Sequence, residues 1–404
     1  MDGHRPEVAD VFREFQAQYL DQWPASVQQR RVLQNIMLCK TSALGGHRAK
    51  CDQCGHEEFF YNSCGDRHCP KCQAAARAKW LADRASEVLG TLYFHVVFTL
   101  PEALGPLALQ NKVVVYGLLF RAAAETLIRI AKDPKHLGAQ VGFLSLLHTW
   151  GQTLQHHPHV HCVVPGGGLS PDRTRWIPAR DSFFLPVRVL SRVFRGKFLA
   201  YLRCAFDEGR IKLHGALSEL REDCQWRAFL RQLSSTEWVV YSKPPFGSAE
   251  RVLKYLARYT HRVAISNKRL VSFQDGKVTF RYKDYRCGSL QRTMTLEATE
   301  FMRRFLQHVL PPSFHRIRYY GFLGNRGRRE NLALARSLLA PGVSQAPASD
   351  PRTTEELTEQ SEAQIHTPPK DQLCPVCKKG HMLIVETFDP PVTPVRALQP
   401  WDTS

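Results

Sequence analysis

Hydrophobic and polar positions alternate with two different periods along the chain, and these periods predict both helices and strands. Between residues 8 and 38 the apolar residues recur at helical spacing, with one break at Trp23-Pro24, so two helices are predicted there. The run FHVVFTLP at 94–101 is β-branched and aromatic and ends at a proline, which is typical of a buried strand. In RLVSFQDGKVTFRYKDY the Asp275-Gly276 pair is a strong two-residue turn signal, so this segment is predicted to form a β-hairpin.

The remaining segments extend this mixed pattern. Helices are predicted at 74–90, 104–132, 187–207, 217–231 and 248–262, and strands at 141–149, 159–165 and 238–243. Because helices and hairpins occur in mixed order, the fold class is expected to be α+β and not doubly wound. Residues 340–372 are rich in Pro, Ser, Thr and Glu and almost free of large apolar side chains, so we expect a disordered linker there.

Composition and charge narrow the choice of partner. The chain has 404 residues, 43% of them apolar, which is enough for a sizeable core. Its 55 Lys and Arg against 37 Asp and Glu give a net charge of +18, and such an excess favours DNA or RNA as a partner. No apolar run approaches the roughly 20 residues that span a bilayer, and the N-terminus lacks an apolar signal core. We therefore expect a soluble, cytoplasmic protein with no membrane partner.

Cysteine pairs at close spacing predict a zinc site near the N-terminus. The chain has 12 cysteines, and in a reducing compartment CxxC pairs bind metal more often than they form disulfides. Cys51-x-x-Cys54 and Cys69-x-x-Cys72 are separated by residues 55 to 68, and two such knuckles supply the four thiolates that tetrahedral Zn²⁺ prefers. Cys64 or His68, inside this loop, is an alternative ligand. Four thiolates leave no open position, so the expected role is structural, with the module positioning DNA.

A second cysteine pair lies near the C-terminus. Cys374-Pro-Val-Cys377 looks like half of such a module, and only His381 is close to it in sequence. Two interpretations stay open: a degenerate knuckle, or an incomplete site that another part of the chain completes.

A dense histidine cluster predicts a second kind of metal site. In LQHHPHVHCVVPGGG, a strand over 159–165 places His159 and His161 on the same face, roughly 7 Å apart along the backbone. Two imidazoles at this spacing can share a divalent cation, Mg²⁺ or Mn²⁺ at a phosphate or zinc in hydrolysis, whereas ordinary hydrogen-bonded histidines are the alternative. The third ligand is open among four residues: His148, Gln155, His156 and His157.

Two tyrosines in KYLARYTHRVAISN are candidate nucleophiles. Tyr255 and Tyr259 are four residues apart and share one helix face, about 6 Å apart at Cβ. An aromatic core stripe is the alternative, but the neighbouring cations Lys254, Arg258 and Arg262, with His261, suit a phosphate better than a core. A phenol that attacks a DNA phosphorus forms a phosphotyrosine, which a free 3′-hydroxyl can then resolve.

The predicted hairpin also carries candidate DNA contacts. Its cations are Lys268, Arg269, Lys277, Arg281 and Lys283. Phe280 and Tyr282 are candidate stacking faces for unpaired bases. The segment 316–329 is a second basic and aromatic stretch.

Together, the motifs NSCGDRHCPKCQ, FHVVFTLP, HTWGQTLQHHPHVHCVVPGGGL, YLARYTHRVAISNKRL and HRIRYYGFL resemble the IS91-like family of insertion-sequence transposases over about residues 10 to 325. The resemblance implies an N-terminal zinc-binding domain and a nuclease domain of the HUH class (His-hydrophobic-His), with a central antiparallel sheet. By position, His159 and His161 match the metal motif, and Tyr255 and Tyr259 match the paired nucleophiles of rolling-circle transposition. The implied substrate is single-stranded or hairpin DNA at transposon ends, in a prokaryotic, nucleoid-associated setting.

The expected organisation has four parts: a helical and zinc-binding domain at 1–92, the nuclease domain at 93–335, the linker at 336–372, and the CPxC segment with its tail at 373–404. Two other functions remain as alternatives. One is the same chemistry in a plasmid-type replication initiator or relaxase, and the other is a non-catalytic, zinc-containing nucleic-acid-binding protein. Homo-oligomer formation stays open.

Overall fold

The structure is a computed structural model, and it describes residues 5–72, 80, 82–180, 184–246, 252, 263–339 and 373–391. Residues 74–79 and 81 of the predicted helix at 74–90, all of the predicted helix at 248–262 except Val252, and residues 340–372 of the predicted linker region lie outside these residues. In the described part of 74–90, residues 80 and 82–85 are helical. Among the described residues, no helix is both long enough and apolar enough to cross a membrane.

The predicted N-terminal helix pair is confirmed. Helix α1 covers Val8–Gln22 and α2 covers Val27–Leu38. Ser26 begins α2 by accepting a hydrogen bond from the Gln29 amide, and the Gln29 side chain accepts one from the Ser26 amide in return. Phe12 of α1 packs edge-on against Phe305, so the two N-terminal helices also pack against a distant part of the chain.

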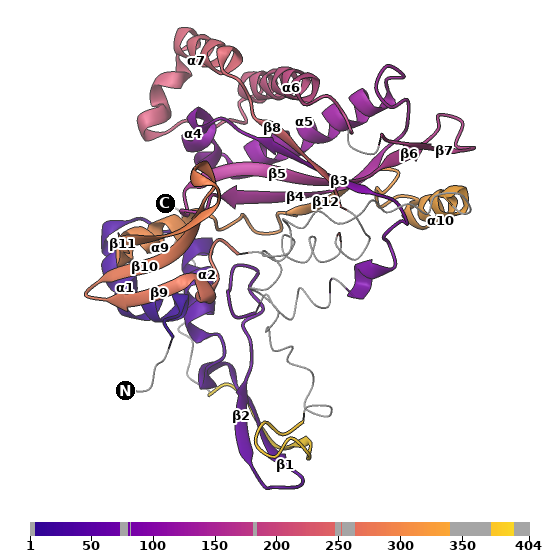
Figure 1. The fold of residues 1–404 in the computed structure, drawn as a ribbon. Coiled ribbons are helices and arrows are strands. Elements are labelled where there is room, and N and C mark those ends of the chain that lie inside the picture. Colours follow the sequence, from indigo (N-terminus) through magenta and orange to yellow (C-terminus); the bar gives the residue numbers. More distant parts are fainter. Residues whose placement is uncertain are drawn as a thin grey trace.

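A five-stranded sheet forms the centre of the molecule (Figure 1). Its order is β12-β4-β5-β3-β8, and every neighbouring pair is antiparallel. The strands are β3 (Tyr93–Thr99), β4 (Gly142–Trp150), β5 (His156–Pro165), β8 (Val240–Phe246) and β12 (Ile317–Gly321). The α+β class with a central antiparallel sheet is therefore confirmed.

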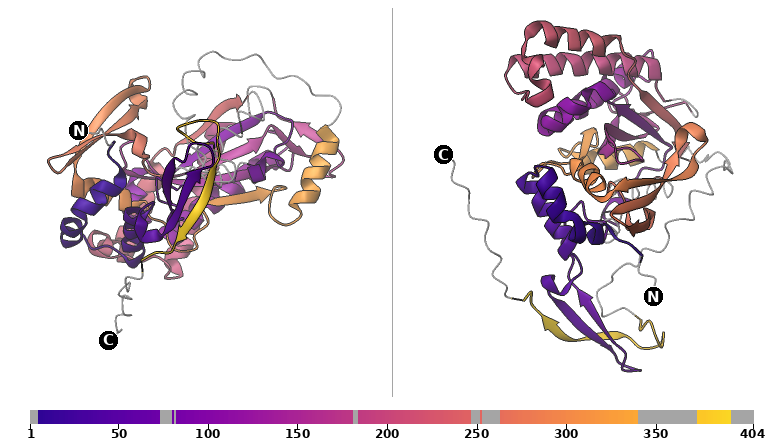
Figure 2. Two further views of the ribbon diagram at one scale, coloured as in Figure 1. Left: turned by 90° about the horizontal axis from the view of Figure 1, so that it is seen from below. Right: turned by 90° about the vertical axis from the view of Figure 1, so that its left-hand side faces the viewer.

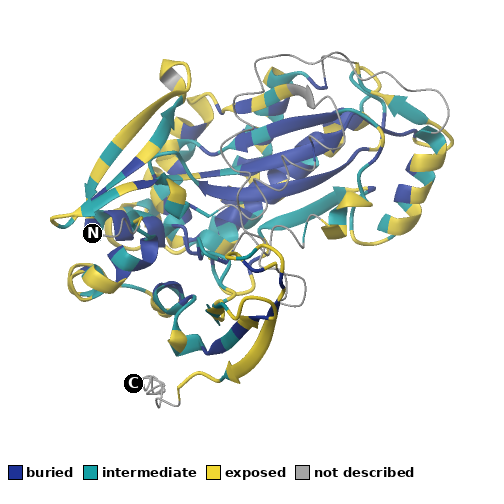
Figure 3. Ribbon diagram, turned by 60° about the horizontal axis from the view of Figure 1, so that its bottom comes forward, coloured by how far each residue is buried: buried dark blue, intermediate teal, exposed yellow. Residues whose placement is uncertain are grey.

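One face of this sheet is covered by helices, which Figure 1 shows stacked above it. These helices are α4 (Gly105–Gln110), α5 (Lys112–Lys132), α6 (Val187–Asp207) and α7 (Asp223–Ser235). Val160, Cys162 and Val164 of β5 point into this layer and belong to the largest buried cluster. In Figure 3 the strands of the sheet are accordingly drawn as buried along most of their length.

The opposite face of the sheet carries the alternate residues of the same strands. Leu144 and Leu146 of β4 and Val163 of β5 form a separate buried cluster with Val252. Since successive side chains of a strand point to opposite faces, His159 and His161 share the face of Val163. The helices α5 and α6 therefore do not cover these histidines.

Two predicted helices are interrupted. The stretch 104–132 breaks at Asn111, where φ is −120° and ψ is 42°, because its side chain bonds the amide and carbonyl of Lys212. The stretch 217–231 begins as a 3-10 segment (Gly215–Arg221) and becomes α7 only after Glu222, whose backbone is extended.

The predicted hairpin is confirmed and belongs to a second sheet of order β11-β10-β9. Its strands are β9 (Leu270–Gln274), β10 (Lys277–Asp284) and β11 (Leu290–Glu297). Asp275 and Gly276 both have positive φ, 51° and 71°, as the tightest hairpin turn requires. Helix α9 (Ala298–Gln307) follows directly and packs against α1.

A third sheet brings the two ends of the chain together. Its order is β13-β1-β2, with β1 at Gly46–Cys51, β2 at Glu57–Tyr61 and β13 at Met382–Phe388. Figure 2 shows the C-terminal strand lying along the N-terminal hairpin, at a distance from the central sheet.

The remaining elements are short or lie at the far end of the central sheet. They are β6 (Gly167–Leu169), β7 (Trp176–Pro178), α10 (Arg328–Leu339) and the 3-10 segments Ser42–Leu44, Glu102–Leu104, Asn267–Arg269 and Tyr285–Cys287.

Candidate active site and metal centres

Three histidines meet on the face of the central sheet opposite α5 and α6. His148 comes from β4, and His159 and His161 come from β5. Their candidate ligand atoms all lie within 4.8 Å of one another. His148 stands directly opposite His159 in the strand register, so ordinary antiparallel pairing is what brings it to the cluster. Of the four residues left open as the third ligand, His148 is the one that the structure groups with the pair.

Hydrogen bonds fix the orientation of these rings. His159 donates from Nδ1 to the His157 carbonyl at 2.6 Å, which places the lone pair of its ring on Nε2. His161 Nδ1 shares a hydrogen bond of 2.7 Å with Nε2 of His95 on β3, and the two rings stack. Burial lowers the pKa of His95 to about 3, so this ring is neutral. Metal-binding imidazoles are commonly held in this way through their second nitrogen.

The other two histidines of the run face elsewhere. His156 bonds the Tyr116 hydroxyl at 2.8 Å through Nε2 and stacks on His308. His308 donates from Nε2 to the Leu154 carbonyl at 3.0 Å, and its Nδ1 bonds the Thr149 hydroxyl. Burial lowers the pKa of both His156 and His308 to about 3. These two neutral rings hold the turn at 151–155 beside the three-histidine cluster.

A cavity of about 580 Å³ opens next to the cluster. Besides the histidines, residues at the β4–β5 turn, at the end of β10 and in the 3-10 segment before β9 line it. They are Trp150, Gly151, Gln152, Thr153 and Gln155, then Tyr282, Lys283, Asp284 and Tyr285, and Arg269. Trp150 stacks on His148, with 4.7 Å between ring centroids. Tyr285 is 63% exposed, and its hydroxyl accepts a hydrogen bond from the Gln152 amide. The cavity therefore combines metal-type ligands with aromatic faces and cations.

The predicted DNA contacts divide into three groups. Arg269 and Lys283 line the cavity, as does Tyr282, and Arg269 also donates to the carbonyls of Gln152 and Arg281. Lys268, Lys277 and Arg281 are exposed without lining it, and Arg281 lies beside Gln291, Arg292 and Thr293. Lys254, Arg258, Arg262 and both tyrosines, Tyr255 and Tyr259, lie outside the described residues.

The prediction that Phe280 offers a stacking face was wrong. This side chain is 0% exposed and packs against Phe301 of α9. The alternation along β10 turns Phe280 into the core and Arg281 outward. Phe280 therefore shapes the second sheet and is not accessible to a base.

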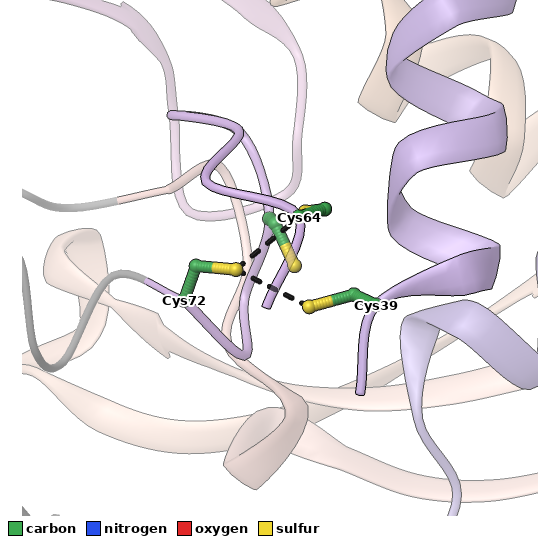
Figure 4. A group of neighbouring side chains, drawn as sticks. Cys39, Cys64 and Cys72 are labelled. Carbon is green, nitrogen blue, oxygen red and sulfur yellow. Dashed lines mark hydrogen bonds between the residues drawn. The ribbon is translucent and has the colours of Figure 1, made fainter. Parts of the chain in front are cut away.

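The cysteines form two groups, and the single site predicted from Cys51, Cys54, Cys69 and Cys72 is wrong. Cys69 and Cys72 join Cys39 and Cys64, with their sulfurs within 4.8 Å of one another. Figure 4 shows Cys39, Cys64 and Cys72 converging where α2 ends, and Cys72 lies 3.2 Å from Cys39 and 3.5 Å from Cys64, sulfur to sulfur. The reason is spatial: Cys39 immediately follows α2, which delivers it to the knuckle at 69–72.

This first cysteine group fits a structural zinc ion. Its four sulfurs, from Cys39, Cys64, Cys69 and Cys72, converge within 4.8 Å of one another. Four sulfur donors are the set that Zn²⁺ takes in closed sites. Cys64 was foreseen as an alternative ligand, whereas Cys39 carried no CxxC signal in the sequence.

The alternative ligand His68 has a different role. Its Nδ1 bonds Asp66 at 2.9 Å, and its Nε2 accepts a hydrogen bond from the Leu310 amide. The neighbouring Arg67 donates to the carbonyls of Pro311 and Phe314. The loop at 66–68 thus fastens the cysteine module to the segment that follows α9.

Cys51 and Cys54 instead group with Cys374 and Cys377, again with all four sulfurs within 4.8 Å. The sulfurs of Cys51 and Cys377 are 3.7 Å apart, and those of Cys54 and Cys374 are 3.6 Å apart. Of the two interpretations of the C-terminal pair, this grouping favours the incomplete site that another part of the chain completes.

Comparisons with known proteins agree with these features. Residues 142–331 match the family described as "Putative transposase", and residues 11–100 match the "Transposase zinc-binding domain" of IS91 type. The chain is 56% identical to the putative transposase y4qJ of Sinorhizobium fredii over 405 residues, 99% of each protein. The chain belongs to the IS91-like family of transposases.

A more distant relative of this transposase is the transposase for insertion sequence element IS801 of Pseudomonas savastanoi pv. phaseolicola. The two are 31% identical over 308 residues, which cover 72% of this chain and 69% of the relative. Among solved structures, the conjugative relaxase TrwC in complex with oriT DNA matches at 14% identity and a TM-score of 0.24, over 61% of this chain and 72% of the relaxase. That score indicates a loose superposition, and the family assignment rests on the sequence relatives.

The matched ranges of this transposase can be compared with its sites. The putative transposase range, 142–331, contains β4, β5 and all three clustered histidines. The zinc-binding range, 11–100, contains the complete group of Cys39, Cys64, Cys69 and Cys72. It contains only half of the second cysteine group, because Cys374 and Cys377 follow both ranges.

Proposed function

We propose that this transposase nicks and rejoins single-stranded DNA at the ends of its element, through a tyrosine nucleophile and a divalent cation. The observation that carries the proposal is the joint position of the three histidines and the cavity beside them. A binding protein has no need of three convergent imidazoles at the mouth of a cationic, aromatic cavity.

His148, His159 and His161 would hold the cation, and their donor set fits one. Three imidazoles on two neighbouring strands supply three nitrogen donors, and a cation held by them would have further positions for phosphate oxygens. His148, His159 and His161 would thereby place a cation that could polarise and orient the scissile phosphate. His95 supports the site from behind by holding the ring of His161 through its second nitrogen.

The nucleophiles are proposed to be Tyr255 and Tyr259. Val252 precedes Tyr255 by three residues, is 0% exposed, and packs with Leu144, Leu146 and Val163 on the face of the sheet that carries the histidines. The position of Val252 supports a nucleophile that acts on the metal face of the sheet. In the proposed step a tyrosine oxygen forms a bond to phosphorus and the P–O3′ bond breaks, so that the tyrosine loses a proton and the leaving strand gains a 3′-hydroxyl.

The cavity lining supports single-stranded or hairpin DNA as the substrate. Trp150, Tyr282 and Tyr285 offer aromatic faces on which unpaired bases can stack, and Arg269 and Lys283 supply cations for the backbone. Bases inside a duplex would have no free face to present to these rings. Rejoining then reverses the first step, with a 3′-hydroxyl attacking the phosphotyrosine.

The proposal is tested by looking for the covalent intermediate. Purified full-length protein is incubated with Mn²⁺ and labelled single strands of its own element's ends, and adducts are resolved on a denaturing gel. We expect an adduct that is lost in the double variant Tyr255→Phe, Tyr259→Phe and in His159→Ala. The control Tyr61→Phe, on β2 of the third sheet, should retain it.

Two outcomes would contradict the proposal. An adduct that survives in the double tyrosine variant would assign the nucleophile elsewhere. Tight DNA binding without any adduct, over a panel covering both element ends as single strands and hairpins, would favour the non-catalytic nucleic-acid-binding alternative.

A further inference from the structure

The second cysteine group has no counterpart in the proposed DNA chemistry. It combines Cys51, the last residue of β1, and Cys54, in the turn that follows, with Cys374 and Cys377, which precede β13. The first pair lies in the zinc-binding family range and the second pair lies beyond both matched ranges. The group therefore joins two parts of the chain that are separate in sequence.

Backbone amides support the sulfurs of this group. The amides of Gln53 and Cys54 point at Cys51 Sγ, at 3.4 and 3.5 Å, and the Gly380 amide points at Cys377 Sγ at 3.4 Å. Amide donors that converge on a cysteine sulfur stabilise negative charge there, as in a metal-binding knuckle. The sulfur–sulfur distances of 3.6 and 3.7 Å exceed the roughly 2.05 Å of a disulfide bond, so the pairs are set apart as ligands are.

The two knuckles are fitted to each other around the sulfurs. The Asp52 amide donates to the His381 carbonyl at 3.1 Å, and the His381 amide donates to Asp52 Oδ1 at 2.9 Å. Gly380 lies where a Cβ atom would come within 2.5 Å of both Cys51 Sγ and Asp52 Oδ1. This close approach requires glycine, so the C-terminal turn is shaped to the N-terminal one.

The third sheet has too little core to hold this arrangement by itself. Its buried cluster consists of Ala49, Cys51, Cys374 and Met382, two of which are the cysteines themselves. Large apolar residues of the same sheet are exposed, namely Phe59, Tyr61, Leu383, Ile384 and Val385. Figure 3 shows β13 as exposed over most of its length. Small modules of this kind usually depend on a metal for stability.

We propose that Cys51, Cys54, Cys374 and Cys377 bind a second structural zinc ion, which fastens the C-terminal segment to the N-terminal zinc-binding domain. Four thiolates in a closed arrangement suit Zn²⁺, and each thiol that binds releases its proton to solvent. The ion is distinct from the one that fits Cys39, Cys64, Cys69 and Cys72, and it does not depend on the cleavage chemistry.

The first test is the zinc content of full-length protein, measured by elemental analysis on identically purified variants. The double variant Cys374→Ser, Cys377→Ser should contain one zinc equivalent less than the wild type. The double variant Cys51→Ser, Cys54→Ser should lose the same equivalent, and the quadruple variant should lose no more than either. As the matched control, the exposed pair Cys204→Ser, Cys224→Ser should leave the zinc content unchanged.

These variants distinguish a second zinc site from the alternative of one N-terminal site that contains all the bound zinc. If Cys51 and Cys54 shared one ion with Cys69 and Cys72, their replacement would remove zinc whereas replacement of Cys374 and Cys377 would not. An unchanged zinc content in the C-terminal double variant would overturn the proposal. Because the comparison measures metal and not DNA cleavage, failure of the proposed enzymatic function would leave it intact.

A second readout covers the case in which a variant folds poorly. A protease site is engineered into the linker at 340–372 of the otherwise wild-type chain, and the chain is cut there after purification. The C-terminal fragment should stay with the body in zinc buffer and separate when a strong chelator is added. Separation in zinc buffer, or retention after the chelator has removed all zinc, would contradict the proposal.

Discussion

At the scale of the residue, the role of each histidine is decided by what its second nitrogen bonds. In the run at 156–161, alternation along β5 sends His159 and His161 to the metal face, which the sequence pattern predicted. The roles of His148 and His95 depend on which strands lie beside β5, and no local pattern contains that information. Cys39 was missed for the same reason, because its partners are brought to it by the fold.

His95 is expected to be a positioning residue for the metal site. Replacing it by Ala removes the hydrogen bond to His161 Nδ1, and losses of this kind weaken metal affinity by about 10–100-fold. The measurement is a Mn²⁺ titration followed by electron paramagnetic resonance. His95→Gln, which retains a donor, should recover part of the affinity, and the distant His47→Ala should leave it unchanged. Equal affinity of His95→Ala and wild type would refute the assignment.

Tyr285 is expected to contribute to binding of unpaired bases. Stacking of one base on an aromatic ring is worth about 1–3 kcal/mol, so Tyr285→Ala should weaken binding of a single-stranded element end by about fivefold or more. Fluorescence anisotropy with a labelled strand measures this. Tyr285→Phe should bind nearly as well as wild type, because it keeps the ring. A similar loss in both variants would instead assign the effect to the hydroxyl bonded to Gln152.

At the scale of the element, the elements that were predicted correctly are those that local sequence signals control. The Trp23-Pro24 break and the Asp275-Gly276 turn each act within a few residues, and both are found as expected. The break at Asn111 was missed because its side chain forms hydrogen bonds with the backbone amide and carbonyl of Lys212, about a hundred residues away in sequence. The pairing of β13 with β1 was missed because no local pattern specifies which strand a distant strand will join.

The stabilising effect of the contact between Glu125 of α5 and Lys197 of α6 should decrease at acid pH. Burial alone would raise the pKa of the Glu125 carboxyl. Hydrogen bonds from Lys197, Tyr201 and Arg121 outweigh burial and lower this pKa to about 2. A carboxyl whose pKa is lowered in the folded state stabilises the protein above its unfolded pKa of about 4.5, and this contribution is lost as pH falls toward 2. Glu125→Gln should therefore lower the melting temperature near pH 6.

The pH series supplies the control for that prediction. The difference in melting temperature between wild type and Glu125→Gln should shrink steadily as the pH is lowered below 4. The exposed pair Arg227–Asp223 on α7 provides a comparison, and Asp223→Asn should change the melting temperature little at any pH. A difference for Glu125→Gln that stays constant with pH would show that the charge contributes nothing.

At the scale of the whole molecule, the N-terminal module is attached to the body by a few specific contacts. Arg67 donates to the carbonyls of Phe314 and Pro311 at 2.6 and 2.7 Å, and it is half-buried. Phe12 and Phe305 pack across the same boundary. Side chains from both matched ranges, 11–100 and 142–331, thus set the position of the zinc module relative to the histidine site.

Arg67→Ala should loosen this attachment. Hydrogen bonds from charged donors are worth about 1.5–3 kcal/mol, so we expect the free energy of unfolding to fall by roughly that amount. Chemical denaturation measures the change, and hydrogen exchange should show faster exchange at 310–314. Arg227→Ala, which removes an exposed cation of the same kind, is the control and should have an effect within about 0.5 kcal/mol. Equal effects of the two variants would mean that Arg67 does not hold the module.

The sheet formed by β1, β2 and β13 has a consequence for the order of events during protein synthesis. Cys54 leaves the ribosome 320 residues before Cys374, so for most of translation its pair can present only half of a ligand set. The nascent chain can form the group of Cys39, Cys64, Cys69 and Cys72 and the central sheet first. The sheet of β1, β2 and β13 can be completed only last. A polypeptide that ends before Cys374 would keep its histidine site but lack β13 and two of the four sulfurs of the second cysteine group, so only a chain that extends through β13 can complete that group.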